Sequence, residues 1–586
     1  MITRRQLLPA AGLFFAEPQA AVPPLDASRI RPPQFSDDDL DLPYYLVHFA
    51  RFANSVRMEP PGRGFIDLSV WRRPADNKPY NARIMENILS LAWFYCTARS
   101  WNPYRGDPAL RARLEAALEF WCGIQSPEGR FSEYGPQKWN LAATAFAVKF
   151  IAEALRLLHG GPAISQAVLK RAAEACRKAI RIVLYDEEWW KFGASVSNQY
   201  TNIFAGGPAF LRLYPDTELE KRLRERIEAS SADFQSPAGY FYEADGPDFG
   251  YNLSTHHENV HMAWHYYRQT PLAQVFIQQQ QLFCEWLGYN ALPEPGQDFF
   301  VLNRAIESRQ RHATWGYVDT PVAERCIIAR AFATPPEVRT ERIRTMRRNL
   351  ETSWPQLPPL AVGEFWAYSP YRFLQRSHFN WRPTAAEIRE ARKLIRAWGG
   401  GEFTHYRSDS RRPVAFAYLK RKAYYAALAS GAVFRPGQRF GLTFVWSPTA
   451  GAVLQSQTGS PAAWGTVIPG KDAPFEASRV EIPFPKGTGD LKPGGFKAEY
   501  PLEGGGSKLI EFHPESIRVE VRREGPVVER LPMLIRGPSP GAESGWRIQT
   551  EAATRYAPEK STLFGSKRLC VVTLEAQNRL AYEIRL

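Results

Sequence analysis

Between residue 44 and about residue 350, apolar side chains recur every three or four positions, the spacing that places them on one face of an α-helix. Loops rich in glycine, proline and aromatic residues separate the segments with this pattern. The clearest segments span 82–99, 108–124, 141–158, 165–184, 219–230, 260–267, 272–287 and 323–332. The pattern predicts stacked helical hairpins. We expect an (α/α)n toroid, an incomplete barrel of such hairpins with a cleft at the inner helix ends.

The pattern changes after about residue 399, where short alternating or β-branched runs replace the helical spacing. These runs span 440–446, 452–457, 480–482, 516–521, 569–574 and 580–584, with Gly- and Pro-rich turns between them. The chain is therefore predicted to be multidomain, with helices first and an antiparallel β-sandwich at the C-terminus. The expected division is a signal segment at 1–21, a Pro- and Asp-rich linker at 22–43, the helical domain at 44–390 and the sandwich at 391–586.

The N-terminal segment carries the features of an export signal. Arg4 and Arg5 precede a short apolar stretch and a run of small residues, which is typical of a twin-arginine signal. No later segment has the roughly 18 uninterrupted apolar residues that span a membrane. We therefore expect a periplasmic or secreted protein without a membrane span. The six cysteines are scattered and form no C-x-x-C pair, so they predict neither a zinc site nor a disulfide scaffold.

Charge and aromatic content narrow the class of partner. The net charge of +14 favours an acidic partner such as a polyanionic polysaccharide, a nucleic acid or an anionic lipid. No run of Lys and Arg resembles a nucleic-acid-binding arm, and no zinc-finger or RNP-type pattern occurs, so we expect no nucleic-acid partner. Aromatic residues make up 13% of the chain, which supplies stacking surface for sugar rings as well as core. An acidic polysaccharide is the favoured partner, and the oligomeric state stays open.

The segment 239–267 concentrates side chains that handle protons. Four of the ten histidines, His256, His257, His261 and His265, follow a Gly-, Asp- and Tyr-rich loop that ends at Tyr251. A helix would align three of them on one face, with His256 about 100° away. We expect the functional site here, although His261 and His265 also fit ordinary polar contacts of a core.

Three sequence blocks carry a resemblance to a known family. They are S-V-S-N-Q-Y-T-N-I-F-A-G-G-P-A-F-L at 195–211, D-G-P-D-F-G-Y at 245–251 and N-R-A-I-E-S-R at 303–309. The first is similar to the Asn-aromatic block of polysaccharide lyases, and the second to the loop that presents their catalytic tyrosine. The third is similar to their Gly-Arg-Ala-Ile-Ser-Arg stretch with one residue inserted. On these motifs the chain resembles the chondroitin and hyaluronan lyases, and more loosely the heparinase II/III and alginate lyases.

The resemblance implies β-elimination at a 4-linked uronic acid. In that reaction a base removes the C5 proton, and a donor must neutralise the neighbouring carboxylate to stabilise the enolate-like intermediate. The family roles would fall on Tyr251 as the base and on Asn198, helped by Gln199, as the neutralising group. Arg304 and Arg309 would bind the carboxylate or stabilise a tyrosinate. Asn198 also fits a helix N-cap, and Tyr251 also fits an aromatic side chain packed in the toroid wall.

The chain departs from the family at the catalytic histidine. Chondroitin-type lyases carry that histidine before the tyrosine loop, where this sequence has Glu243, and heparinase-like lyases carry Asn-His where it has Asn198-Gln199. A catalytic histidine would therefore be His256 or His257. Other candidate substrate contacts are Tyr200, Glu243, His312, His378, Trp139 and Trp190.

Three other classes of protein are compatible with the sequence. A glycoside hydrolase on the same toroid needs two carboxylates, for which Glu133, Glu243, Asp245 and Asp248 are candidates. A zinc-dependent hydrolase would use H-E-N-V-H at 257–261, which matches H-E-x-x-H. A non-catalytic carbohydrate-binding protein is the third. The lyase interpretation is preferred, and it requires no metal and no other cofactor.

Overall fold

A computed structural model describes residues 20–68, 76–309, 312–358, 370–374, 376, 378–468, 470, 473–492, 494 and 496–586, without the side chains of Ser460 and Ala542. Most of the predicted signal segment at 1–21 lies outside these residues. The chain forms two compact units: the first comprises Met1–Ala143, Phe150–Lys178 and Thr345–Phe373, and the second comprises Thr144–Lys149, Ala179–Arg344 and Leu374–Leu586. In the part that the structure describes, no helix is both long enough and apolar enough to cross a membrane.

The first unit is helical. Among its described residues, it holds five α-helices of its own and shares four with the second unit. Its own helices are α1 Leu42–Leu46, α2 Phe49–Ala53, α3 Ala82–Met85, α4 Ile88–Cys96 and α5 Pro108–Gly123, and the shared ones are α6 Leu141–His159, α7 Gln166–Tyr185, α15 Pro336–Ser353 and α16 Tyr371–Leu374. Residues 22–43, predicted as a linker, contain three 3-10 turns. Phe35 of this segment is buried, with its ring 4.9 Å from that of Trp101 and 5.7 Å from that of Trp354.

The helices of the second unit surround the segments singled out in the sequence. They are α8 Glu187–Gly193, α9 Ser197–Tyr200, α10 Asn202–Leu213, α11 Thr217–Asp233, α12 Phe249–Leu253, α13 Thr255–Tyr267, α14 Ala273–Asn290 and α17 Ala385–Arg392. Carboxylates begin several of them: Asp216 Oδ1 accepts from Leu219 N at 3.1 Å at the start of α11. Gly206 of α10 lets this helix lie against α6, because a Cβ there would be only 2.7 Å from the backbone nitrogen of Lys149.

The helix predicted at 323–332 is replaced by two 3-10 turns, η6 Pro321–Glu324 and η7 Ile327–Phe332. A continuous α-helix would use the carbonyl groups of Ala323 and Glu324 for its own N–H groups. Both carbonyl groups instead accept from the guanidinium of Arg330, at 2.8 Å each. The prediction of one helix here is wrong because a side chain, invisible to the periodicity, occupies these acceptors.

All strands that the structure describes belong to the second unit. A small sheet pairs β1 Ala291–Pro293, β2 Phe300–Leu302 and β3 Thr314–Trp315. A large antiparallel sheet follows in the order β11-β4-β5-β6-β7-β8-β14-β13-β12, with further strands paired to it. Its strands are β4 Phe403–Asp409, β5 Val414–Lys420, β6 Tyr425–Ala432, β7 Gly441–Ser447, β8 Gly451–Gln455, β9 Gly465–Val467, β10 Arg479–Val480, β11 Thr488–Leu491, β12 Lys497–Pro501, β13 Ser507–Phe512, β14 Ser516–Arg536, β15 Arg547–Thr550, β16 Ala553–Phe564 and β17 Lys567–Arg585.

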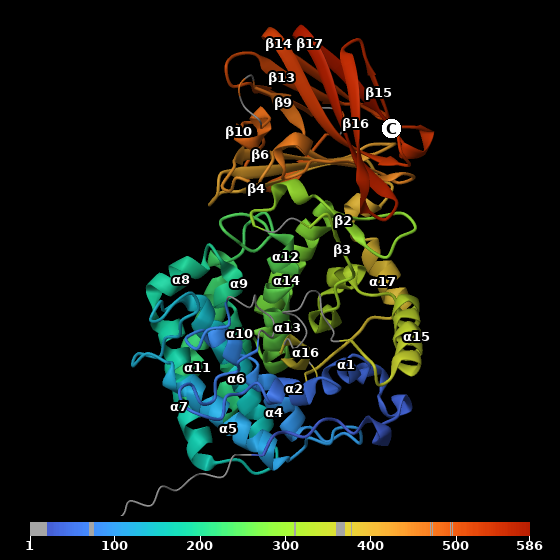
Figure 1. Ribbon diagram of the computed structural model, residues 1–586. Helices are drawn as coiled ribbons and strands as arrows, with labels where there is room; N and C mark the ends of the chain where they lie inside the picture. Colours follow the sequence, from blue (N-terminus) through green and yellow to red (C-terminus); the bar gives the residue numbers. More distant parts are fainter. Residues whose placement is uncertain are drawn as a thin grey trace, which may run out of the picture. The chain divides into compact units, whose positions relative to one another are not determined.

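Within this unit, β4 and β6 lie next to the helices α12 and α14, and β13, β14 and β17 lie farther from them (Figure 1). Hydrogen bonds tie the near strands to the end of α14, including Asn290 Nδ2 to Tyr418 Oη at 2.8 Å and Tyr425 Oη to Tyr289 O at 2.5 Å. Helices therefore come first and an antiparallel β part follows, as predicted. The last α-helix before the large sheet, α17, ends at Arg392, and the first strand of that sheet, β4, begins at Phe403. The division into domains stays a prediction. Ring closure of the helices stays a prediction.

Two strands are much longer than the sequence runs suggested. The runs at 516–521, 569–574 and 580–584 fall within β14 and β17, which pair from Ser516↔Arg585 to Arg536↔Lys567. The Gly525-Pro526 pair, typical of a turn, is absorbed as a bulge at which the register shifts between Arg522 and Pro526. Gly525 has a φ of +81°, and proline is tolerated in a strand at a bulge, so the ladder continues.

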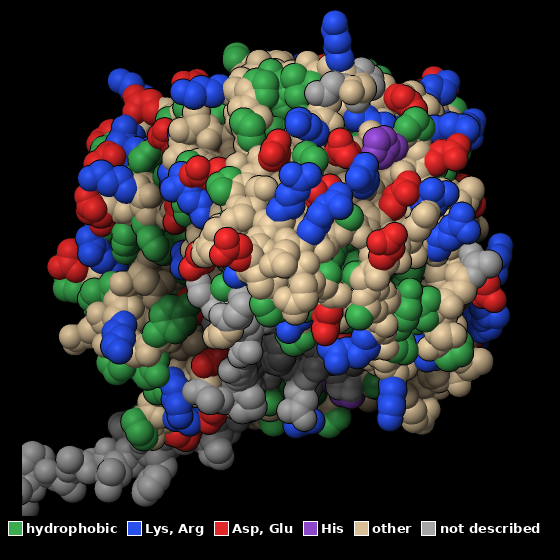
Figure 2. All heavy atoms as spheres, turned by 90° about the horizontal axis from the view of Figure 1, so that it is seen from above, with side chains coloured by type: hydrophobic (Ala, Val, Ile, Leu, Met, Phe, Trp, Pro, Cys, Tyr) green, Lys and Arg blue, Asp and Glu red, His purple; other side chains and the backbone are tan. Residues whose placement is uncertain are grey.

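The surface carries both signs of charge. On the face shown in Figure 2, Lys and Arg side chains are interspersed with Asp and Glu side chains instead of gathering into one basic patch. The net charge of the whole chain is +14, but on this face the positively charged side chains are dispersed.

A buried ion triad joins strands β13 and β14 to the 3-10 turn η11 Phe475–Ala477. Lys508, Glu476 and Glu529 have fully buried side chains, with Lys508 Nζ 2.5 Å from Glu476 Oε1 and 2.8 Å from Glu529 Oε1. Burial raises the pKa of Glu529, and the nearby Lys508 ammonium opposes this rise. Removing one member of such a triad leaves charge buried without compensation.

Lys508→Met is therefore expected to lower the free energy of unfolding by about 3–5 kcal/mol. The measurement is a denaturant titration followed by tryptophan fluorescence. Lys422→Met is the control, because Lys422 forms an exposed pair with Glu515 and should leave the midpoint nearly unchanged. Equal effects of the two substitutions on the free energy of unfolding would show that pairing within the triad does not stabilise the fold.

Candidate functional site

The structure brings the three sequence blocks together in the second unit. The first block, 195–211, forms α9 and α10. The second, 245–251, is the loop that enters α12, and the third contains the 3-10 turn η5 Arg304–Ile306. Asn198, Glu243, Tyr251 and Arg309 meet where these blocks contact each other.

The carboxyl group of Glu243 lies at the centre of this contact and is 0% exposed. It accepts hydrogen bonds from Asn198 N at 2.7 Å, from Asn198 Nδ2 at 2.5 Å and from Ser197 Oγ at 3.3 Å. Arg309 Nη1 lies 3.6 Å from its Oε2 atom. Burial raises the pKa of Glu243 to about 8, against the lowering effect of the Asn198 hydrogen bonds and of Arg309, whereas Asp248 adds to the rise. The acid form therefore predominates at neutral pH.

Tyr251 and Arg309 face the solvent side of this contact. The guanidinium carbon of Arg309 lies 4.8 Å from the centre of the Tyr251 ring. Tyr251 is half-buried and Arg309 is exposed, whereas Asn198 is buried with Glu243. Tyr251 N donates to Asp248 Oδ1 at 2.9 Å, so the cap of α12 fixes the backbone that carries the phenol. A guanidinium at this distance is attracted to the face of the aromatic ring.

The residue inserted in the third block, Glu307, ties this block to the tyrosine loop. Its carboxyl oxygens accept from Phe249 N at 3.0 Å and from His312 N at 2.7 Å. Burial raises the pKa of Glu307 well above its ordinary range, and Asp248 contributes to the rise. The next residue, Ser308, donates its N–H to Pro247 O at 2.9 Å and its hydroxyl to Glu243 O. An insertion that looked like a departure from the family pattern thus holds two blocks together.

The histidines near Tyr251 lie in other surroundings. His256 is buried, with its ring 3.7 Å from that of Phe241, and lines a small cavity with Asn259. Among the residues that the structure describes, neither ring nitrogen of His256 has a hydrogen-bond partner. Burial lowers its pKa to about 3. His257 Nε2 lies 3.2 Å from Asp319 O, and burial lowers its pKa as well. Its buried position in the core makes His256 unsuited to remove a substrate proton.

The residues of H-E-N-V-H do not converge as zinc ligands do. His261 is buried with a pKa lowered to about 3 by burial and by neighbouring histidines, and Glu258 lies 3.8 Å from Lys149. Within the described ranges, no group of three or more His, Cys, Asp or Glu side chains is arranged to hold a metal ion.

The carboxylates named for a hydrolase are engaged elsewhere. Asp245 Oδ1 accepts from Arg412 Nη2 at 2.7 Å, and Asp248 caps α12.

Glu133 belongs to the first unit, where its Oε2 atom lies 3.8 Å from Arg83 Nη1. Glu243 remains as the carboxyl group with a raised pKa, and it is buried behind Asn198 and Arg309.

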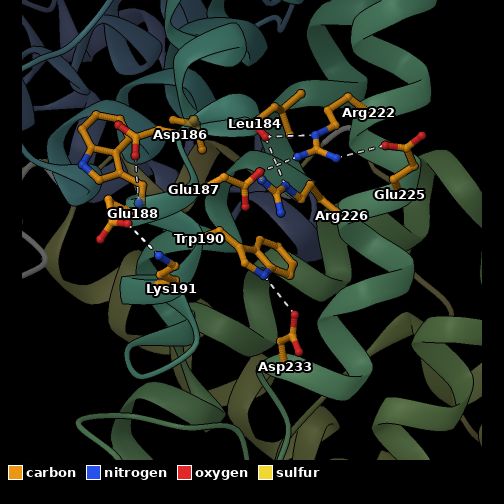
Figure 3. Close-up of polar contacts among 12 residues, drawn as sticks. Leu184, Asp186, Glu187, Glu188, Trp190, Lys191, Arg222, Glu225, Arg226 and Asp233 are labelled. Atoms are coloured by element: carbon orange, nitrogen blue, oxygen red, sulfur yellow. Dashed lines mark hydrogen bonds and ion pairs between the residues drawn. The ribbon is translucent and has the colours of Figure 1, made fainter.

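Two predicted sugar contacts are core residues. The Trp190 ring lies 4.4 Å from the guanidinium carbon of Arg226, and its Nε1 donates to Asp233 Oδ2 at 2.9 Å (Figure 3). Tyr200 is fully buried and donates its hydroxyl to Val183 O at 3.0 Å. Both side chains are buried in the core.

The other candidates are spread around the site or away from it. Gln199 is half-buried next to Asn198, and Arg304 Nη1 donates to Gln457 Oε1 at 2.8 Å. The His312 ring lies 5.0 Å from that of Trp315, and burial, then Arg304, lowers its pKa.

Two further candidates lie apart from this contact. His378 stacks on His265 with the ring centres 4.5 Å apart. Trp139 belongs to the first unit, where it pairs with Ser132 in a β-bridge.

Comparison with known proteins finds similarity at the level of structure. No family model matches the chain, and no curated protein matches its sequence. The fold is similar to that of the chondroitin AC lyase of Streptomyces coelicolor A3, solved in complex with chondroitin sulphate, at 11% identity and a TM-score of 0.46, with 94% of this chain and 79% of that chain covered. It is similar to the heparan sulfate lyase HepC from Pedobacter heparinus at 10% identity and a TM-score of 0.44, with coverages of 91% and 82%. Heparinase III matches at 9% identity and a TM-score of 0.47, with coverages of 97% and 87%. These are lyases of the kinds that the sequence motifs resemble.

The buried, uncharged state of His256 gives a test by pH. Its folded-state pKa of about 3 lies below the ordinary value of 6.5, so between these values the native state binds fewer protons than the unfolded state. Stability contributed by the neutral ring is therefore lost as the pH falls through this window. As the pH falls from 6 to 4, this group should lower the unfolding free energy of the wild type by about 1.4 kcal/mol per pH unit. His256→Leu should remove this contribution to the loss.

The measurement is a series of urea titrations at pH 6, 5 and 4. His159→Leu is the control, because His159 is exposed at the end of α6 and the slope should stay that of the wild type. An unchanged slope in His256→Leu would show that the ring is solvated in solution.

Proposed function

We propose that the protein is an exported polysaccharide lyase that cleaves an acidic, uronic-acid-containing polysaccharide by β-elimination. The observation that carries the proposal is the arrangement of one side chain from each of the three blocks around Glu243, which precedes the second block. The half-buried Tyr251 lies beside the guanidinium of Arg309, and Arg309 in turn adjoins the buried Asn198–Glu243 pair. This arrangement supplies a base and a carboxylate-binding group side by side, which elimination next to a carboxylate requires.

Tyr251 is the proposed base. Its oxygen takes the C5 proton, the C–H electrons form the C4–C5 double bond, and the glycosidic oxygen at C4 leaves and receives a proton. The phenol of a tyrosine ordinarily has a pKa of about 10, so its anion needs stabilisation near neutral pH. Arg309, whose guanidinium carbon lies 4.8 Å from the ring centre, is the positively charged group beside this phenol.

Arg309 and Asn198 are the proposed partners of the substrate carboxylate. An ionised Glu243 would cancel the charge of Arg309 and repel the incoming uronate. Burial raises the pKa of Glu243 to about 8, so this carboxyl group is mostly uncharged at neutral pH. The guanidinium then keeps its attraction for the substrate, and Glu243 acts by positioning Asn198.

A glycoside hydrolase on the same fold is the alternative. It needs two carboxyl groups that flank the scissile bond. Asp245 is paired with Arg412, and Asp248 is committed to a helix cap. The side chains that solvent reaches at this contact, Tyr251 and Arg309, favour elimination over hydrolysis.

Incubation with glucuronan, alginate, hyaluronan, chondroitin and heparin-like polymers tests the reaction type. Elimination on at least one polymer should produce the ultraviolet absorbance of a C4–C5 double bond together with new reducing ends. New reducing ends without this absorbance would establish hydrolysis and exclude the lyase.

Tyr251→Phe should lower kcat by about 10²–10⁴-fold, the usual contribution of a general base. Tyr185→Phe, which removes an exposed hydroxyl bonded to Glu218, is the matched control and should keep wild-type activity.

The pH dependence of the reaction tests the proposed role of Glu243. Raising the pH through about 8 ionises this group in the wild type and adds negative charge beside the substrate carboxylate. Glu243→Gln stays uncharged, so the ratio of its kcat/KM to that of the wild type should be constant near pH 7. Above pH 8 this ratio should rise, by about tenfold per pH unit at the limit for one ionisation. Glu218→Gln at an exposed pair on α11 serves as the control, and a ratio for Glu243→Gln that stays flat to pH 9.5 (about 1.5 units above the pKa) would contradict the role.

A further inference from the structure

The tip of the β4–β5 hairpin packs against the loop that leads to Tyr251. Asp409, the last residue of β4, is 3% exposed, and one of its carboxylate oxygens accepts three hydroxyl groups from this loop. Asp409 Oδ2 lies 2.7 Å from Ser236 Oγ, 3.1 Å from Tyr240 Oη and 2.6 Å from Tyr242 Oη. Hydrogen bonds to an ionised acceptor are stronger than neutral ones, so this oxygen is a firm anchor.

The same hairpin tip contacts the loop through two arginines. Asp409 Oδ1 accepts the backbone N–H groups of Arg411 and Arg412, at 2.8 and 3.1 Å, which fixes the turn that presents their side chains. The guanidinium carbons lie 5.0 and 5.1 Å from the Tyr242 ring centre, respectively. Arg412 Nε and Nη2 both donate to Asp245 Oδ1, at 3.0 and 2.7 Å. The hairpin tip thus contacts the loop at Tyr242 and at Asp245, on both sides of Glu243.

The segment 242–245 has an unfavourable backbone conformation. Ala244 and Asp245 have φ values of +53° and +67°, in the left-handed region where a Cβ crowds the backbone. Such conformations persist when surrounding contacts hold them in place. The anchors at Tyr242 and Asp245 flank these two residues directly, so the hairpin tip supplies contacts that hold the turn.

The segment 242–245 also carries the central carboxyl group of the site. Glu243 follows Tyr242, whose carbonyl oxygen accepts from Ser197 N at 2.9 Å, and its own carboxyl group holds Asn198. A shift of Tyr242 or Asp245 would therefore move Glu243 and, through it, Asn198. The charged groups that face Glu243 are Arg309 and Asp248.

We infer that the tip of the β4–β5 hairpin is a positioning element for the site, with Asp409 and Arg412 as the residues that hold Glu243 in place. The inference rests on the proposed function for its effect on catalysis. The β part of the chain then contributes to the reaction without contacting the substrate through these residues.

Asp409→Asn tests the inference, since it keeps the size of the side chain and removes its charge. We expect hydrogen exchange of peptides from 235–251 to become faster, as measured by mass spectrometry. We also expect kcat to fall by about 10²-fold, the effect of misplacing a catalytic group by about 1 Å. The alkaline limb of the kcat/KM profile should move to lower pH, because a loosened Glu243 is better solvated and ionises more readily. Arg412→Lys should change all three readouts in the same direction and less strongly, because an ammonium keeps the charge without the two-atom contact.

Glu520→Gln is the matched control. Glu520 of β14 is also a buried carboxylate that holds an arginine, with Arg579 Nε at 3.0 Å from its Oε1 and Arg579 Nη2 at 3.2 Å from its Oε2, and these contacts are not with the loop. This variant should keep wild-type exchange in 235–251, kcat and pH profile. An Asp409→Asn variant with wild-type kcat and alkaline limb would overturn the inference, whatever its exchange rate. If the wild type eliminates none of the polymers, the proposed function fails separately, and wild-type exchange in Asp409→Asn would then overturn the positioning role by itself.

Discussion

The burial of a single carboxyl group, that of Glu243, is the constraint on which the site depends. A buried carboxyl group is unfavourable unless its oxygens find donors, and here the donors are the backbone and side chain of Asn198 and the hydroxyl of Ser197. Arg309 adds positive charge from the third block. Three segments that are far apart in the sequence are therefore held together by the need to satisfy one group. Loss of any of the three would leave the carboxyl group buried with fewer partners.

A second buried network holds the same region from the helical side. The ammonium group of Lys149 donates to Asn259 Oδ1 at 3.0 Å, and Asn259 Nδ2 reaches Thr201 Oγ1 at 3.0 Å and Asn198 O at 3.4 Å. The close approach of α6 and α10 at Gly206 gives Lys149 its place in this network. Asn198 is thus fixed through its side chain by Glu243 and through its carbonyl oxygen by Asn259. Fixation from two directions is what an amide needs in order to present a constant geometry to a ligand.

Local signals made much of the fold predictable, and distant side chains account for the rest. The helices at 108–124 and 141–158 begin at Asp107-Pro108 and Asn140, where the cap residue is visible in the sequence. The number of histidines in the cluster says nothing about their burial, and His256 lies against Phe241 in the core. The three motif blocks did locate Asn198, Tyr251 and Arg309 together. Asp409 carries no local signal, because its partners lie more than 150 positions earlier in the chain.

In the proposed function, the geometry of the contact divides the chemistry between its members, with glutamate at the position where the lyases that the motifs resemble have histidine. Proton transfer requires direct contact with the substrate, so it falls to a group that solvent reaches, and Tyr251 is such a group. Electrostatic effects act over several ångströms and more strongly in a poorly solvated interior, so a buried group can exert them. Glu243, uncharged below its pKa of about 8, leaves the field of Arg309 directed at the site and places negative charge there only when the pH rises. A histidine at this position would have added a base. In the proposed mechanism, the glutamate instead makes the strength of carboxylate binding depend on its own protonation.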